Sequence, residues 1–377
     1  MASKSYTFAV IPKRTNSPYW QVVKNGCEIR AKRLTKEIAA NVTCLFIGPS
    51  EGGAETEENQ ARIVEDLIDG KYGTIDGLAL AVVEAPSAER LIEKSVQKGI
   101  HVVTFDTDAP NSKRLAYIGT DNKAMGRELG RVLLQINSEG GKFGMVGAGG
   151  ANIMQRYQGV RDALINSKWV EVADSPKDCG GNSSLAAQQM SELVDTNPDL
   201  GAIIPVGAWP SESVFMRCGF QDIQEYSDSL SIDNSFSNHI LSSYYTVNDD
   251  VTWQDFVDEN RNVITVVGDS LQGQIDLMNM GYADALVGQL PFEMGKFAID
   301  RLLEVRKSQD AGLALPFENQ IFPTSFLDVV NIPQDLPPMV IDMNYKGGWV
   351  ILGYTLFGVI ALLCEFCIIM AVMHSCN

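Results

Sequence analysis

Polar and aromatic side chains gather in the loops that directly follow short apolar runs of this 377-residue chain. The loops are 16–20 with Asn16, Tyr19 and Trp20, 106–108 ("DTD"), 147–156 ("GAGGANIMQR"), 207–210 ("GAWP"), 268–270 ("GDS") and 288–291 ("GQLP"). A polyhydroxylated ligand needs this combination, because each hydroxyl requires a donor and an acceptor while the C–H face of a ring stacks on an aromatic side chain. The loops therefore predict a binding site for a small polar ligand.

The elements that would position these loops are expected to alternate between strands and helices. Apolar, β-branched runs predict strands at 7–11, 42–47, 77–83, 101–105, 142–146, 202–206, 264–267 and 285–287, with a short extra strand ending near 117–122. Amphipathic stretches such as 87–98 and 122–136 predict helices between them, the second capped by Thr120 or Asp121. The alternation predicts right-handed βαβ units in two parallel sheets, which bind ligands beyond the carboxyl ends of their strands.

An ordered set of short motifs resembles the type I periplasmic-binding proteins, in particular the branch that binds ribose and galactose. The motifs, spread over residues 7–331, are "NSPYW", "VVTFDTD", "IGTDN" with "GRELG", "QRYQGV", "NPDLGAII" and "VVGD" followed by "ALVGQLPFEMG". The resemblance implies two Rossmann-like lobes joined by three hinge crossovers, which close over a small ligand. The N-terminal lobe would comprise 6–119 with 290–322, and the C-terminal lobe 120–289 with 323–332.

The resemblance also implies which side chains contact the sugar. They are Asn16, Tyr19, Trp20, Asp106, Arg156, Asp269 and Gln289, with Thr107, Thr120 and Trp209 as further candidates. Asp106 and Asp269 would accept from hydroxyls, and Arg156 would donate through its guanidinium. Structural alternatives remain open: the two aspartates as helix caps or turn residues, Arg156 as a surface residue of a helix, and the two aromatics as core packing.

Several positions depart from the pattern of the sugar-binding branch. Thr107 stands where a second basic residue is frequent, Ala81 and Val82 where a polar Asn is common, Cys179 at an aromatic position and Gly207 at an Asn position. These changes favour a ligand other than ribose.

The segment 349–373, "WVILGYTLFGVIALLCEFCIIMAVM", carries a single charge, Glu365. At about 1.5 Å per residue a helix of this length crosses a hydrocarbon core of about 30 Å, which predicts one transmembrane helix rather than a buried or interfacial one. Residues 333–348 would form an extended stalk before it. A single-pass membrane protein with its binding domain extracellular or periplasmic is expected, although no signal peptide is visible and flanking charges give no orientation. The arrangement also resembles the start of a class C receptor.

Composition and motifs argue against several other classes of protein. The net charge of −17 disfavours nucleic acid as a partner, and the first predicted strand begins too early for a preceding helix-turn-helix. The cysteines of the soluble part and the three histidines of the whole chain form no zinc or hydrolase motif, and "VGAGGA" lacks the dinucleotide spacing. We therefore expect no metal, no cofactor and no catalytic residue. The polar segment 221–262 predicts a surface insertion.

The expected function is membrane-anchored binding of a small polar ligand, most simply a carbohydrate or similar polyol, by lobe closure. It would serve sensing or uptake, with a possible downstream transmembrane or signalling partner. The alternative is an enzyme on the same two-lobed scaffold that acts on a sugar or a nucleotide.

Overall fold

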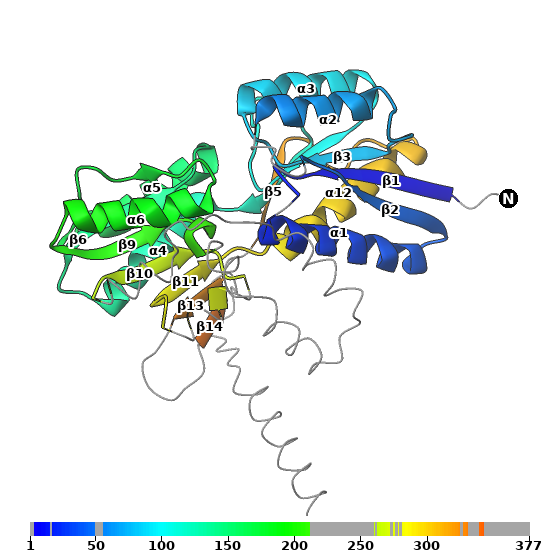
Figure 1. Cartoon of the computed structure of the whole chain (residues 1–377). Coiled ribbons are helices and arrows are strands. Elements are labelled where there is room, and N and C mark those ends of the chain that lie inside the picture. The colour runs from blue at the N-terminus through cyan, green and yellow to red at the C-terminus, as the bar shows by residue number, and fades with distance from the viewer. Residues whose placement is uncertain are drawn as a thin grey trace, which may run out of the picture.

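The computed structural model (Figure 1) describes residues 4–15, 17–49, 56–211, 260, 262–271, 274–275, 278 and 281–324, and the strands 327–330 and 339–342. No helix within these residues has the length and apolar character that a membrane span requires. Asn16, the apolar segment 349–373 and all of the expected insertion 221–262 except positions 260 and 262 lie outside them.

The N-terminal lobe is built on a six-stranded parallel sheet with the strand order β12-β5-β4-β3-β1-β2. The strands are β1 Lys4–Ile11, β2 Ala40–Phe46, β3 Gly77–Leu80, β4 Val102–Phe105, β5 Ala116–Thr120 and β12 Gln320–Thr324. Helices α1 Pro18–Glu37 and α12 Pro291–Asp310 cover one face, and α2 Glu57–Ile68 and α3 Ala85–Gln97 cover the other (Figure 1). Residues 323–324, which were expected in the other lobe, pair with β5 here.

The sequence forms this sheet because its central strands are buried on both faces. Along β1, Phe8 and Val10 join the core beneath α1 and α12, while Ala9 and Ile11 join the core beneath α2 and α3. Strands covered by helices on both sides read as continuous apolar runs, which is why they are recognisable in the sequence.

The C-terminal lobe contains an eight-stranded sheet with the order β14-β13-β11-β10-β9-β6-β7, in which β8 also pairs with β6. Its elements are α4 Asn122–Ile136, β6 Gly141–Gly147, α5 Ala151–Leu164, β7 Trp169–Glu171, β8 Lys177–Asp178, α6 Ser183–Thr196, β9 Leu200–Pro205, β10 Ile264–Gly268, β11 Ala285–Gly288, β13 Leu327–Val330 and β14 Met339–Asp342. Strands β13 and β14 are antiparallel, and β14 falls within the segment 333–348 that was expected to be an extended stalk.

The chain passes between the two sheets three times among the described elements. The crossovers lie between β5 and α4, between β11 and α12, and between β12 and β13. At the first of them, the side chain of Asp121 accepts a hydrogen bond from the Ala124 amide and caps α4. Asp121, rather than Thr120, is therefore the helix cap of the two that the sequence allowed.

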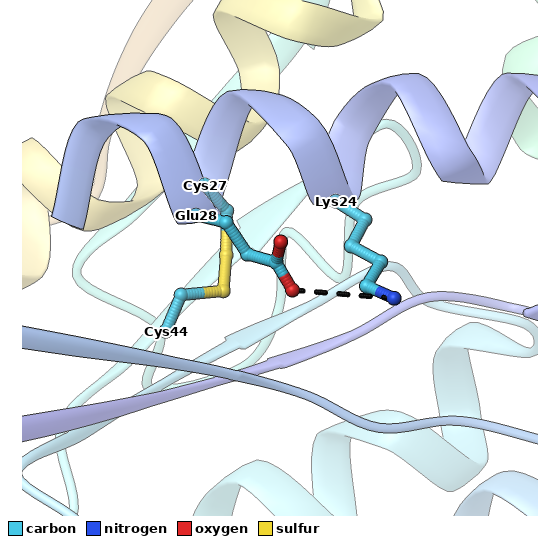
Figure 2. The surroundings of a disulfide bond; sticks show 4 residues. All are labelled: Lys24, Cys27, Glu28 and Cys44. Carbon is cyan, nitrogen blue, oxygen red and sulfur yellow. Dashed lines mark ion pairs between the residues drawn. A yellow bond between two sulfur atoms is a disulfide. The ribbon is translucent and has the colours of Figure 1, made fainter. Parts of the chain in front are cut away.

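A disulfide joins α1 to the edge strand β2 (Figure 2). Cys27 and Cys44 lie 17 residues apart with their Cα atoms 6.0 Å from each other, and Cys27 is completely buried. On the same helix, Lys24 forms an ion pair with Glu28. The spacing of the cysteines did not reveal this pair, because the two positions meet only when α1 packs on β2.

Reduction of this disulfide is expected to lower the free energy of unfolding by about 3 kcal/mol, because closing a loop of this length restricts the unfolded chain. Urea unfolding of the soluble part with and without reductant measures the change. The Cys27→Ala/Cys44→Ala double variant should have the same free energy of unfolding as the reduced protein, and reductant should not change it. A midpoint that does not move on reduction would contradict a stabilising role.

Candidate functional site

A cavity lies between the two lobes at the carboxyl ends of their strands. Its lining combines residues of the loops that follow strands of both sheets with residues near the N-terminal ends of α1 and α5: Lys13, Arg14, Ser17, Tyr19, Trp20, Asp106, Ala148, Gly149, Asn152, Ile153, Arg156, Ala208, Trp209, Asp269 and Gln289. The structure thus brings together six of the seven side chains implied by the resemblance, and Trp209 of the further candidates. Thr107 and Thr120 are buried beside the cavity without lining it.

The N-terminal wall is organised around the carboxylate of Asp106, which follows β4. The hydroxyl of Tyr19 donates to its Oδ1 over 2.9 Å, and Thr107 donates to its Oδ2 over 2.9 Å. Lys13 Nζ lies 3.4 Å from the same Oδ2. Burial, and the negative charges of Asp106 and Asp269, raise the pKa of Tyr19 well above its ordinary value, so the phenol stays protonated and holds the carboxylate in place.

Tyr19 and Trp20 belong to the hydrophobic core and to the cavity wall at once. They pack edge to face with ring centroids 5.0 Å apart, and Trp20 packs in the same way on Phe105. Both are less than a tenth exposed. The core-packing alternative is therefore correct for the bodies of these rings, while their remaining surface faces the cavity.

Arg156 is buried in the C-terminal wall and is not a surface residue of α5. Its Nε donates to Asn122 Oδ1 over 2.8 Å, and its Nη1 donates to the Val206 carbonyl over 2.7 Å. Neither bond uses Nη2, and Arg156 also lines the cavity. The two bonds fix the guanidinium against α4 and the end of β9.

Asp269, which follows β10, is held by one group of its own lobe and by one side chain of the crossover between β11 and α12. Its Oδ2 accepts from the Ala208 amide over 3.0 Å, and its Oδ1 accepts from Gln289 Nε2 over 2.7 Å. The Gln289 carbonyl oxygen in turn accepts from the Thr120 hydroxyl over 2.9 Å. Thr120 therefore orients Gln289. This role explains why Thr120 is buried beside the cavity without lining it.

The environment of Asp269 opposes its ionisation. Burial raises the pKa of Asp269, and the positive charge of Arg156 together with the Gln289 hydrogen bond lowers it by a smaller amount. A ligand hydroxyl that donates to this carboxylate would favour the ionised form.

The two cavity aspartates also share an uncommon backbone conformation. Asp106 has φ of 59° and Asp269 has φ of 75°. Few residues other than glycine adopt positive φ, and such positions concentrate at functional sites. Aspartate is one of the few residue types besides glycine that tolerate this conformation.

Asn152 is a cavity residue that sequence reasoning did not single out. It is 6% exposed in the first turn of α5, and its Oδ1 has no hydrogen-bond partner among the described residues. A buried amide oxygen without a partner is costly, so the position suits a ligand hydroxyl. The helical spacing of four between Asn152 and Arg156 could have pointed to it, because such residues share one helix face.

Lys13, Arg14 and Ser17 were likewise not predicted, although they flank the predicted aromatics. Across the described residues, no cluster of three potential metal ligands occurs. The arrangement offers carboxylate acceptors, cationic and amide donors and aromatic surface, which is chemistry for binding a polar ring. Whether each predicted residue contacts a ligand stays a prediction.

Comparison with known proteins places these features in a family. Residues 8–310 match the model of the periplasmic binding protein domain. The D-allose-binding periplasmic protein of Escherichia coli (strain K12) is 27% identical over 207 residues, which cover 52% of this chain and 62% of that protein. The match thus spans less than two thirds of that relative.

Two solved structures illustrate the similarity in fold. GanP, a glucose-galactose binding protein from Geobacillus stearothermophilus, has a TM-score of 0.66 at 22% identity, covering 88% of this chain and 100% of its own. A solute binding protein from Burkholderia graminis C4D1M, solved with D-arabinose, has a TM-score of 0.67 at 21% identity, covering 88% and 97%. All three of these relatives are named as binding proteins, which is the class of protein that the sequence led us to expect. The chain belongs to the periplasmic binding protein domain family.

Proposed function

We propose that this protein binds a monosaccharide or a closely similar polyol in the cavity between its lobes. The observation that carries the proposal is the convergence of Asp106, Arg156 and Asp269 with the Tyr19 and Trp20 rings on one cavity. Two carboxylates accept from hydroxyls, and the guanidinium donates to ring or hydroxyl oxygens. Relatives named for D-allose and for glucose and galactose support a sugar as the ligand.

The proposed mechanism is closure of the lobes around the ligand. Asp106 stands on one lobe and Arg156 on the other, so a ligand that bonds both holds the lobes together. Closure selects a pre-existing conformation to the extent that the ligand binds it more tightly than the open one. Ligand binding thereby shifts the protein to the closed conformation, which a membrane partner can recognise.

We further propose that the protein acts outside the cytoplasm, in sugar uptake or sensing, and that residues 349–373 anchor it in the membrane. The disulfide between Cys27 and Cys44 supports an oxidising compartment. A similar fold occurs in a solved XylFII-LytSN complex, with a TM-score of 0.63 at 20% identity over 82% of this chain and 95% of that one. A complex of that kind supports the proposal that a partner protein receives the signal.

Titration calorimetry of the soluble part against D-allose, D-galactose, D-glucose, D-arabinose and D-ribose tests the proposal. Binding of at least one sugar with a micromolar or lower Kd is expected, with no consumption of the sugar over hours. Failure of every sugar to bind would refute the proposal, and product formation would favour the enzyme alternative.

Sugar affinity is expected to fall as the pH is lowered, beginning above the pH range in which an ordinary aspartate takes up a proton. Because burial raises the pKa of Asp269, this carboxyl takes up a proton at a higher pH than an ordinary aspartate does and then no longer accepts from a hydroxyl. Below that pKa the Kd should rise by up to about tenfold per pH unit. Calorimetry at a series of pH values measures how the Kd changes. Asp269→Asn, which does not titrate, should bind weakly with little pH dependence, and an unchanged wild-type Kd would exclude this role.

A further inference from the structure

Arg14 joins the two lobes directly, away from the three crossovers. It lies in the loop between β1 and α1, and its Nη1 donates to the carbonyl oxygen of Gly181 over 3.3 Å. Gly181 belongs to the loop between β8 and α6 of the other lobe. The two residues are 167 positions apart, so their contact depends on how the lobes are placed and not on local chain geometry.

The loop that carries Arg14 is fixed to the N-terminal lobe. The neighbouring Thr15 bonds the Pro49 carbonyl through both its amide and its hydroxyl, each over 2.9 Å. The Gln21 side-chain amide donates to the Thr15 carbonyl over 2.6 Å and ties the loop to α1. Arg14 therefore moves with its lobe.

The acceptor is fixed to the C-terminal lobe in the same manner. The Cys179 amide donates to the Gly147 carbonyl over 2.8 Å, and the Gly180 amide donates to Asp178 over 2.9 Å. Gly181 has φ of 78°, a conformation that glycine adopts without strain. Each partner is thus rigid on its own lobe, and rotation of the lobes about the crossovers would separate them.

We propose that Arg14 is a positioning residue that stabilises the closed conformation through the Gly181 carbonyl. Its effect would be the same for every ligand, because the bond is made between protein groups. A change in the closed population multiplies the apparent Kd of all ligands by one factor. A residue that contacts the ligand changes the Kd of different ligands by different factors. Arg14 also lines the cavity, so the experiment must separate these two roles. This inference rests on the proposed sugar binding.

The test compares Arg14→Ala, Arg14→Lys and the wild type. It uses two sugars that both bind the wild type and differ in the configuration of one hydroxyl. The first pair to try is D-allose with D-glucose, and the second is D-galactose with D-glucose. Calorimetry gives the Kd, and stopped-flow tryptophan fluorescence gives the dissociation rate, since Trp20 and Trp209 line the cavity. Arg62→Ala, an exposed arginine of α2 outside the cavity, controls for the loss of one positive charge. Ligand-free unfolding curves confirm that each variant is folded.

Arg14→Ala should raise the Kd of both sugars by the same factor, about threefold to tenfold, mainly because the sugars dissociate faster. The ratio of the two Kd values should stay within about twofold of the wild-type ratio. Arg14→Lys should recover part of the loss, and Arg62→Ala should match wild type. A changed ratio would overturn the proposal by making Arg14 a ligand contact, and an unchanged Kd would overturn it outright. If the wild type binds none of these sugars, the proposed function fails as well, and this result is distinct from the other two.

Discussion

Arg156→Leu is expected to abolish detectable sugar binding, with a Kd at least about a thousandfold above that of the wild type, or about 4 kcal/mol. The substitution removes a guanidinium that lines the cavity and leaves Asn122 Oδ1 and the Val206 carbonyl without their present donors. It also removes the positive charge that lowers the pKa of Asp269, so that this buried carboxyl is more readily protonated. The single substitution therefore removes a donor to the ligand, the Arg156 guanidinium, and also weakens an acceptor, the Asp269 carboxylate.

Calorimetry measures the loss, and denaturant unfolding measures what the change costs the fold. Arg161→Leu is the matched control, because it removes the same charge from the same helix where Arg161 pairs with Glu171 over 2.7 Å at the surface. The control should lose at most about 1 kcal/mol of stability and keep its sugar affinity. A Kd of Arg156→Leu within tenfold of the wild type would remove Arg156 from the site.

The sheets could be predicted largely because their central strands are buried on both faces. β3, β4 and β11 are buried throughout, and such strands have to be apolar along their whole length. The strands that the sequence did not predict are short or lie toward the sheet edges, as β7, β8 and β12 do, and exposed positions such as Val170 and Ile321 interrupt their patterns. Edge pairing depends on neighbours brought by the fold, so it leaves little periodicity to detect.

The residues of the candidate site likewise divide into those that the sequence could identify and those that it could not. Side chains at the ends of predicted strands, such as Asp106 and Asp269, could be identified because parallel strands deliver their carboxyl ends to one edge. Asn152 was missed although its helical spacing from Arg156 could have pointed to it, because the spacing becomes informative only once Arg156 is known to face the cavity. Arg14 could not be identified, because its position in the cavity depends on the placement of one lobe against the other. The roles of Thr107 and Thr120 also depend on the tertiary structure, since each donates a hydrogen bond to a cavity residue without lining the cavity itself.

In each lobe, a helix that carries site residues packs against a helix that begins directly after a crossover. α5, with Arg156, packs on α4, and α1, with Tyr19 and Trp20, packs on α12. Glycines make both contacts close: a Cβ at Gly126 would collide with the Arg156 carbonyl oxygen, and a Cβ at Gly295 would collide with the Val23 carbonyl oxygen. The backbone of each site helix is thereby positioned by the segment that follows the hinge.

Gly126→Ala is therefore expected to lower the free energy of unfolding by about 3 kcal/mol, because α4 and α5 must separate to admit the methyl group. Helix propensity alone predicts the opposite sign, a gain of up to about 1 kcal/mol. Since the displaced backbone is that of Arg156, the same variant should bind sugar at least about tenfold more weakly even when fully folded.

Urea unfolding and calorimetry on one preparation separate the two effects of Gly126→Ala. Arg127→Ala, the exposed next residue of α4, is the control for a helix substitution that leaves the interface alone, and it should change neither stability nor affinity appreciably. Gly295→Ala should reproduce the loss of stability in the other lobe, because its Cβ meets backbone in the same way. A stabilised Gly126→Ala protein with normal affinity would show that the helices can part without cost, and the coupling between the hinge and the position of Arg156 would then have to be abandoned.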